Sequence, residues 1–309
     1  MEQKRKRLTK TNLRRWVPIY ILGLPAIIYL FINNYMPLYG LTIAFKDYKY
    51  NLGIAGSEWC GFKNFEYLFA TKDAWTITRN TLLYNFVFII LNMVLGVTVA
   101  IFLNEIRKKT TKKIYQTLIL LPYLMSMVVV SYLAYAFLGD QTGIINSVLK
   151  SIGLRPIRFY ATKAYWPFIL TFVNEWRVIG YSSIIYLATL VGLGSDCYEA
   201  AMVDGATKWQ QIRYITLPQL KPTVIMMTTL AMGTIFRSDF GLFYQIPRNQ
   251  GMLYPVTDTI DTYVFRALLE NSNIGLSSAA AFYQSVVCFI TIIVFNAIVN
   301  KISKEDALF

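Results

Sequence analysis

Six long apolar segments constrain the fold of this chain of 309 residues more than any other feature. They cover roughly 16–36, 80–103, 114–138, 165–192, 222–246 and 276–300. Each is long enough to cross the hydrocarbon core of a bilayer, which takes about 20 mostly apolar residues in a helix. Only 15% of the residues are charged, whereas about 25% are charged in a typical soluble domain. The sequence therefore predicts an all-α integral membrane protein with six transmembrane helices.

The sequence lacks the residues that several classes of enzyme and metalloprotein require. It contains no histidine, which excludes His-based catalytic triads and His metal sites. Cys60, Cys197 and Cys288 lie far apart, without the C-x-x-C spacing of zinc knuckles and redox pairs. No G-x-x-x-x-G-K-S/T phosphate loop occurs, so ATP would have to be bound by another protein. We expect no catalytic site, no metal and no cofactor bound by this chain.

Basic residues are concentrated in two segments. The first fifteen residues contain seven Lys and Arg against Glu2 alone, and the connection 104–113 contains five against Glu105. The positive-inside rule places both segments in the cytoplasm, and an even number of spans returns the C-terminus to the same side. We predict a multi-pass protein of the cell (plasma) membrane with cytoplasmic tails at 1–15 and 301–309. Topology and contact with the lipid bilayer then explain the net charge of +13, and no nucleic acid partner is expected.

The same rule sorts the remaining connections between spans. Segment 193–221 is expected on the cytoplasmic side, and 37–79, 139–164 and 247–275 on the outer side. The connection 37–79 is long and rich in aromatic residues, which indicates a folded external cap. No internal repeat with a fixed period is visible, so residues 16–300 are expected to form one membrane domain.

The cytoplasmic connection 193–221 has the pattern of two short helices joined by a turn. Its first half is rich in helix formers up to Asp204 and Gly205, a pair that indicates a turn or a helix end. In the second half apolar residues recur every three positions, and two prolines are expected to stop that helix and begin the next span. These residues are Ala206, Trp209, Ile212 and Ile215, followed by Pro218 and Pro222. A hairpin that merely joins two spans at the membrane surface is the alternative interpretation.

The residues of this connection closely resemble the EAA loop of bacterial ABC importer permeases. The matching positions are Glu199, Ala200, Ala201, Asp204, Gly205, Ile215, Leu217 and Pro218. An external segment at 59–65 matches the family's W-x-G-x-x-N-F pattern, and the resemblance extends over about residues 16–300. The stretches 239–245 and 259–266 are similar to those maltose-type, binding-protein-dependent sugar permeases that serve oligosaccharides cut from polysaccharides. One departure is Ile212, at a position that is often aromatic in sugar importers.

The resemblance implies a type I ABC importer permease fold and a set of partners. These are two cytoplasmic ATPase subunits that hold ATP and Mg, a second permease subunit that forms a heterodimer with this chain, and an extracellular solute-binding protein. Glu199 would pair with a basic residue of the ATPase, Gly205 would permit the turn, and Ala200 and Ala201 would allow close packing. Truncating Glu199 would leave its partner charge unpaired, at a cost of roughly 2–5 kcal/mol. Loss of transport without loss of insertion is therefore expected for Glu199→Ala and Gly205→Val.

Charged residues inside the fourth and fifth predicted spans are candidates for the translocation pathway. Intramembrane charges cost about 2.5–3.5 kcal/mol each on insertion scales, so they normally face a cavity or each other. The predicted topology places both groups in the outer half of the membrane, where they could be neighbours. The candidates are Glu175, Trp176, Arg177, Arg237, Asp239 and Tyr244, with Asn92 and Asn174 as further polar residues. Structural salt bridges between the spans and a polar lining that contacts sugar hydroxyls both remain open.

The leading hypothesis is a permease subunit of an ATP-driven, binding-protein-dependent importer that forms half of the pathway for an oligosaccharide. An ABC permease for another solute, such as a glycerol phosphate or a peptide, is the nearest alternative. An ion-driven secondary transporter would predict inverted repeats, and a membrane enzyme would predict clustered Asp, His or Ser near the interface. The sequence leaves open whether the sugar is neutral or contains uronic acids. It also leaves open whether this chain or its partner makes the main sugar contacts.

Overall fold

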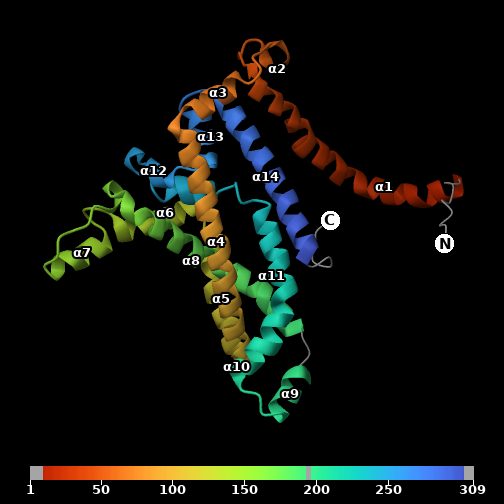
Figure 1. Cartoon of the computed structure of the whole chain (residues 1–309), viewed down its shortest axis with the longest axis vertical. Coiled ribbons are helices and arrows are strands. Elements are labelled where there is room, and N and C mark those ends of the chain that lie inside the picture. Colours follow the sequence, from red (N-terminus) through yellow and green to blue (C-terminus); the bar gives the residue numbers. More distant parts are fainter. Residues whose placement is uncertain (1–9, 193–195, 303–309) are drawn as a thin grey trace.

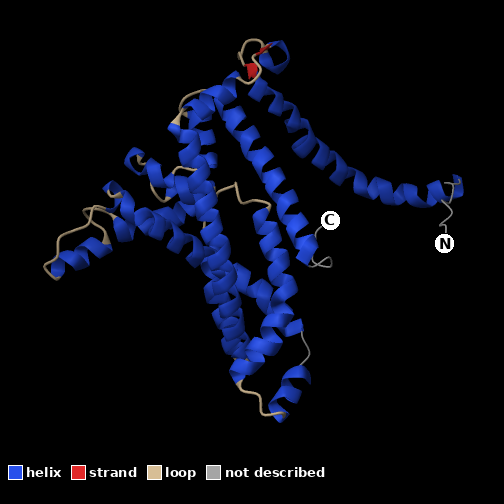
Figure 2. Cartoon of the chain, viewed as in Figure 1, coloured by secondary structure: helices blue, strands red, loops and turns tan. Residues whose placement is uncertain are grey.

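The structure, a computed structural model, describes residues 10–192 and 196–302. These residues form an almost entirely helical protein with one short pair of strands (Figure 2). Long helices stand in a central bundle, and the N-terminal helix extends away from it (Figure 1). Residues 1–9 of the predicted basic tail, 193–195 at the start of the predicted EAA loop and 303–309 of the predicted C-terminal tail lie outside the described residues.

The N-terminal helical segment packs least on the rest of the chain. α1 (Lys10–Leu30) continues through a π turn, η1 (Phe31–Tyr35), into a 3-10 segment, η2 (Met36–Phe45). Residues 16–45 are apolar enough to cross a membrane, yet none of their most apolar stretch is buried in the chain. The sequence predicted that the first span ends near residue 36. The helical course runs on to Phe45 because η2 is itself apolar and packs on the last helix, α14 (Ile274–Ile302).

A small folded unit follows within the predicted external cap. It consists of β1 (Lys46–Asp47), α2 (Gly53–Gly56), β2 (Glu58–Trp59) and α3 (Lys63–Ala70), with the two strands antiparallel. The side-chain amide of Asn64 donates to the carbonyls of Ala44 at 3.0 Å and Lys46 at 3.1 Å, which ties α3 to the start of the hairpin. The remaining residues of the predicted cap belong to η2 and to the next long helix.

Two long helices form the centre of the bundle. α4 (Lys72–Glu105) packs along α8 (Trp166–Gly192), and α5 (Lys109–Leu124) packs on both of them. A Cβ atom at Gly180 would overlap the backbone carbonyl of Ile119, so only glycine permits this approach of α5 to α8. Close contact at small residues is typical of helix pairs in membranes. Further apolar packing comes from Tyr186, Leu187 and neighbouring residues of α4.

The predicted third span is not one straight helix. α5 ends at Leu124 and α6 (Met127–Leu138) begins after a bend of 95°. The bend follows Pro122, which cannot donate a backbone hydrogen bond, and the side chain of Ser126 caps the new helix by accepting from Val129 N–H. The chain therefore turns aside where the hydropathy pattern predicted a continuous crossing.

The predicted fifth span, 222–246, is also interrupted. α11 (Leu217–Met232) ends before Gly233, and residues 233–239 have no regular helix. Side chains of other helices donate hydrogen bonds to the backbone of this segment. Asn85 donates to the carbonyls of residues 235 and 237, and Gln284 donates to the carbonyl of residue 236. Irregular backbone at membrane depth is tolerated only with such partners or beside a cavity. Arg237 and Asp239 thus lie in a non-helical segment, which corrects their predicted placement within a helical span.

Shorter elements complete the described chain. They are α7 (Ile144–Ser151), η3 (Phe159–Ala161), η4 (Lys163–Tyr165), α9 (Asp196–Val203), α10 (Lys208–Gln211), η5 (Ile212–Thr216), η6 (Gly241–Gln245), η7 (Gly251–Leu253), α12 (Tyr254–Thr257) and α13 (Ile260–Leu269). Within the described residues, three helices are long and apolar enough to cross a membrane. The number reaches five if each of two sharply bent helix pairs counts as one span. A mostly helical, multi-pass membrane architecture is confirmed.

Candidate functional site: coupling loop and polar pathway

The predicted turn at Asp204 and Gly205 is present and joins α9 to α10. Gly205 has a φ of +77°, in the left-handed region that favours glycine. Its N–H donates to the Met202 carbonyl at 3.1 Å, and the N–H of Ala206 donates to the Ala201 carbonyl at 2.8 Å. This pair of hydrogen bonds is the Schellman arrangement that ends many helices. The turn therefore depends on a backbone conformation that glycine adopts without strain.

α9 is an exposed helix at the far end of the molecule (Figure 1). Glu199, Ala200 and Asp204 are exposed, and Ala201 is half-buried. Within the described residues the Glu199 carboxylate has no hydrogen-bond or ion-pair partner. Val203 is an apolar side chain that is 89% exposed. α9 therefore presents an unpaired carboxylate and an exposed apolar side chain on the surface of the described chain.

Several contacts fix this loop to the membrane helices. The hydroxyl groups of Tyr198 on α9 and Thr216 on η5 lie 3.1 Å apart, and the Lys208 ammonium on α10 lies 2.9 Å from the Glu105 carboxylate at the end of α4. Thr207 and the third residue of α10 form a capping box at the start of that helix. α9 is thus linked to η5, and α10 to the end of α4.

One prediction about this loop is wrong. Pro218 and Pro222 do not stop the second helix, because η5 leads directly from α10 into α11. The π turn of η5 directly precedes Pro218, whose missing N–H removes one backbone hydrogen bond without ending the helix. In the predicted apolar stripe Ile212 and Ile215 are half-buried, whereas Trp209 is 67% exposed. Leu217 and Pro218 are exposed at the start of α11.

Two of the predicted pathway residues form an ion pair. Arg177 on α8 donates to the Asp239 carboxylate at 2.7 Å, so the expected proximity of the two charged groups is confirmed for this pair. The Arg177 guanidinium also lies 5.9 Å from the ring centre of Tyr123, which stacks on Tyr181 with 4.8 Å between ring centres. Sequence reasoning did not single out these two tyrosines, because nothing distinguishes them among the many aromatic residues of the chain.

Glu175 and Arg237 do not pair with each other. Glu175 is buried and accepts a hydrogen bond from Asn174 at 3.0 Å, while its second carboxylate oxygen is buried without a partner. Arg237 instead lines a cavity of about 240 Å³ together with Asn85, Asn92 and Asn174. Asn85, a polar residue in a mostly apolar stretch of α4, is a further site residue that sequence reasoning missed.

The other two pathway candidates are aromatic. Tyr244 on η6 stacks on Phe240 at 4.8 Å and lies 5.0 Å from the ring of Phe265, and its hydroxyl donates to Glu270 at 3.3 Å. Trp176 on α8 is 39% exposed. Tyr244 thus belongs to an aromatic cluster with a polar edge, a surface on which a sugar ring could stack.

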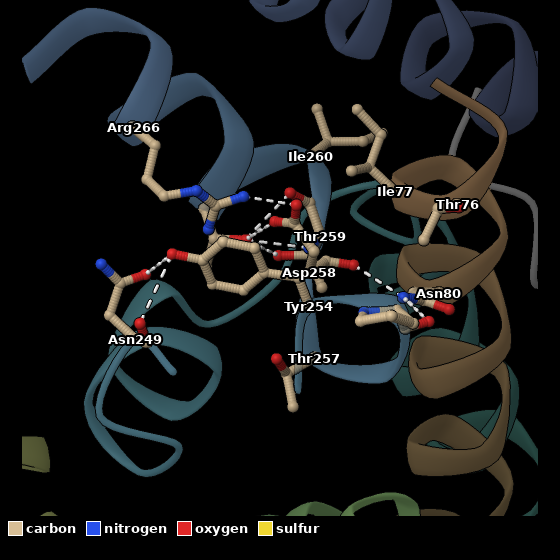
Figure 3. A network of polar contacts seen from close by, with 12 residues as sticks. Thr76, Ile77, Asn80, Asn249, Tyr254, Thr257, Asp258, Thr259, Ile260 and Arg266 are labelled. Carbon is tan, nitrogen blue, oxygen red and sulfur yellow. Dashed lines mark hydrogen bonds and ion pairs between the residues drawn. The ribbon is translucent and has the colours of Figure 1, made fainter. Parts of the chain in front are cut away.

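A second polar network joins the segment around α12 to α4 and α13 (Figure 3). Arg266 pairs with the buried Asp258 carboxylate and lies 4.1 Å from the ring centre of Tyr254. Asn80 donates to the Asp258 backbone carbonyl at 2.9 Å, and Tyr254 donates to the Asn249 side chain at 2.9 Å. Burial raises the pKa of Asp258, and the positive charge of Arg266 opposes that rise. The network fixes the turn that precedes α12.

Comparison with known proteins identifies the family. Residues 76–304 match the family described as "Binding-protein-dependent transport system inner membrane component". The chain is 32% identical over 304 residues to the "Polygalacturonan/rhamnogalacturonan transport system permease protein YteP" of Bacillus subtilis (strain 168), covering 98% of this chain and 94% of that protein. It is 31% identical over 287 residues to "Protein LplB" of the same organism, covering 93% and 90%.

Solved structures agree with this match. The chain has a TM-score of 0.86 and 30% identity to a chain in the crystal structure of a bacterial ABC transporter involved in the import of the acidic polysaccharide alginate. The score is also 0.86, with 31% identity, for that transporter in complex with an alginate pentasaccharide-bound periplasmic protein. In both cases the match covers 95% of this chain and 98% of the other.

The fold is therefore that of a membrane permease. The chain belongs to the binding-protein-dependent inner membrane permeases, and it is a permease subunit of an ABC importer. Members of this family are not enzymes, and ATP hydrolysis belongs to partner subunits.

Proposed function

We propose that this chain forms half of the translocation pathway for oligosaccharides released from acidic polysaccharides of the pectin or alginate type. The observation that supports this most is the near-complete match, at 30–32% identity, to a permease named for polygalacturonan and rhamnogalacturonan and to one from an alginate importer. The cavity lined by Arg237 and three asparagines fits such a solute, because amides can bind hydroxyls and a guanidinium can bind a carboxylate. A glycerol phosphate or peptide substrate has no comparable support.

The same proposal includes six spans with both termini in the cytoplasm. α5 with α6 would supply the third crossing, α8 the fourth and α11 the fifth. The concentration of basic residues before residue 16 and in 104–113 favours this orientation. It places α9 and α10 in the cytoplasm and the turn before α12 outside.

Coupling to the ATPase would occur at α9. Two cytoplasmic ATPase subunits, which hold ATP and Mg, would receive this helix in a cleft, with Glu199 paired to a basic residue and Ala200 and Ala201 packed closely. The exposure of Glu199 and the lack of a partner for it within the described residues support this role.

A second permease subunit would complete the pathway as a heterodimer, and an extracellular solute-binding protein would deliver the sugar. The apolar surface of α1 supports a permease partner, because little of it is covered by this chain. Large uncovered apolar surfaces mark interfaces with other proteins or with lipid.

ATP hydrolysis by the reconstituted complex tests the proposal. The complex would contain this chain, its neighbouring permease and the ATPase, with binding protein either empty or loaded with oligogalacturonides, oligoalginates or neutral oligosaccharides. We expect stimulation by binding protein loaded with an acidic oligosaccharide and loss of that stimulation in Glu199→Ala. Glu66→Ala, which removes an exposed glutamate from α3, serves as the matched control. Uptake driven by an ion gradient without ATP would refute the proposal.

A further inference from the structure

A cavity separate from the one at Arg237 lies between the end of α6 and the turn that precedes α12. Its volume is about 560 Å³, within the range of roughly 300–1,000 Å³ typical of small-molecule sites. Tyr135, Asp140 and Gln141 line it from one side, and Arg248 and Gln250 from the other. Both lining segments belong to connections that the charge pattern places outside the membrane.

The side chains around this cavity have hydrogen-bonding capacity that the chain does not use. One carboxylate oxygen of Asp140 is buried without a partner. Within the described residues no hydrogen bond is made by the side-chain amides of Gln141 and Gln250 or by the Tyr135 hydroxyl. A buried polar atom without a partner is costly, so a ligand or water that supplies the missing hydrogen bonds would be bound favourably.

Arg248 is the one residue of this lining with a positive charge, and its guanidinium is held in place. It lies 4.3 Å from the ring centre of Tyr135. Stacking on an aromatic ring occupies the face of a guanidinium and leaves its N–H groups available. Within the described residues these N–H groups have no hydrogen-bond or ion-pair partner. A guanidinium that stacks on a ring by its face can bind a carboxylate through the N–H groups at its edge.

The backbone that presents Arg248 is strained. Arg248 has a φ of +56°, in a region that residues other than glycine and asparagine seldom occupy, and Asn249 follows with a φ of +48°. The polar network of Figure 3 holds this turn: the Asn249 side chain accepts from Tyr254 and donates to Glu270 at 3.0 Å, and Tyr254 lies against Arg266. Strained backbone fixed by surrounding contacts is often found at ligand-binding positions.

The surroundings of the cavity also favour an anionic ligand that continues toward the pathway. Residues 140–163 contain four basic side chains and one acidic one, Asp140, which lies 3.9 Å from the Arg158 guanidinium. Arg248 lines a second cavity of about 230 Å³, which is shared with Tyr132 and the pathway candidate Tyr244. A ligand with several rings could therefore contact the two cavities on either side of Arg248.

We infer that the cavity formed by Tyr135, Asp140, Gln141, Arg248 and Gln250 is a binding site for a uronic-acid residue of the incoming oligosaccharide. The sugar carboxylate binds the Arg248 guanidinium, and sugar hydroxyls donate to Asp140 and bind the two glutamines. This site rests on the proposed function, and it adds a contact outside the cavity at Arg237.

Direct binding tests the inference without the binding protein. The complete transporter in lipid nanodiscs is titrated with oligogalacturonides from the disaccharide to the pentasaccharide and with neutral galacto-oligosaccharides of the same lengths. Loss of a charge-assisted hydrogen bond weakens binding about tenfold or more. We therefore expect Arg248→Gln to weaken binding of the acidic sugars by about that factor and to leave the weaker binding of neutral sugars unchanged. Arg155→Gln, which removes an exposed positive charge outside the cavity, should bind like the original protein.

A second variant and a second measurement separate the alternatives. Gln250→Ala leaves the charge in place and should weaken binding of acidic and neutral sugars alike. Equal affinities for Arg248→Gln, Gln250→Ala and the original protein would overturn the inference. So would an Arg248→Gln variant that weakens attachment of the binding protein whether empty or loaded, because Arg248 would then contact that protein. If ATP hydrolysis of the original complex responds to no oligosaccharide-loaded binding protein, the proposed function itself fails.

Discussion

Replacing Gly205 tests whether the turn between α9 and α10 transmits force. Its φ of +77° costs an ordinary L-residue about 1–2 kcal/mol, which is a factor of about 5–30 in the ratio of the correct turn to other conformations. No atom lies within 4 Å of a Cβ added at this position, so the penalty comes from the backbone and not from a clash. Coupled uptake should fall about 5–30-fold in Gly205→Ala, and Gly205→Val should abolish it because a β-branched residue fits this region worst.

Uptake into proteoliposomes and ATP hydrolysis, measured on the same preparation, are the assays. Asn tolerates the left-handed conformation better than other residues, so Gly205→Asn should retain more uptake than Gly205→Ala. Gly192→Val adds the same side chain at the end of α8, where there is open space and φ is not positive, and it should transport normally. The amount of protein in the membrane should not change in any variant. Normal uptake in Gly205→Val, or equal loss in the Asn and Val variants, would refute this account of the turn.

Two further changes test the contacts that hold the loop and the broken span. Asn85→Leu removes the donor to two carbonyls of segment 233–239 and should destabilise the protein by about 1–3 kcal/mol. The Tm in detergent should therefore fall. Asn33→Leu, on the exposed η1, should leave the Tm unchanged. An unchanged Tm in the first variant would mean that water replaces the amide. The exposed ion pair of Lys208 and Glu105 contributes about 0.2–1 kcal/mol, so Lys208→Glu should reduce stimulated ATP hydrolysis up to about fivefold at low salt. Adding Glu105→Lys should restore the hydrolysis, because the pair is then present with its charges exchanged. A double variant no better than the single one would exclude a role for the pair.

The turn between α9 and α10 was predictable because its structure depends on neighbours in the sequence. The residues before Asp204 are helix formers, and Gly205 supplies a conformation that few other residues can adopt. The order of the residues alone therefore predicted where the helix ends. The course of the chain after Ile215 could not be predicted in this way. Whether Pro218 ends a helix depends on whether a π turn precedes it, which no residue pattern in this stretch specifies.

The segment 222–246 shows where a prediction of helices from hydropathy fails. Residues 222–246 are apolar enough to predict one helix, but Asn85 and Gln284 supply hydrogen bonds that allow the backbone to leave the helix after Met232. These donors come from distant parts of the chain, so only the folded structure reveals them. Thr234 and Arg237 of the interrupted segment line the cavity, so the sequence could name its charged residue but not the arrangement around it.

The positions of the turn and the cavity on one helix explain how the two could act together. From Lys208 to Met232 the chain is helical without a break, and the 16 residues of α11 alone span about 24 Å at 1.5 Å per residue. The far half of α11 lines the cavity through Thr228 and Ala231. A displacement of α9 would therefore reach the cavity through one rigid element, provided that the turn at Gly205 holds its shape. The Gly205 variants should accordingly separate ATP hydrolysis from uptake while the affinity for loaded binding protein stays constant, and a parallel loss of that affinity would contradict transmission through α11.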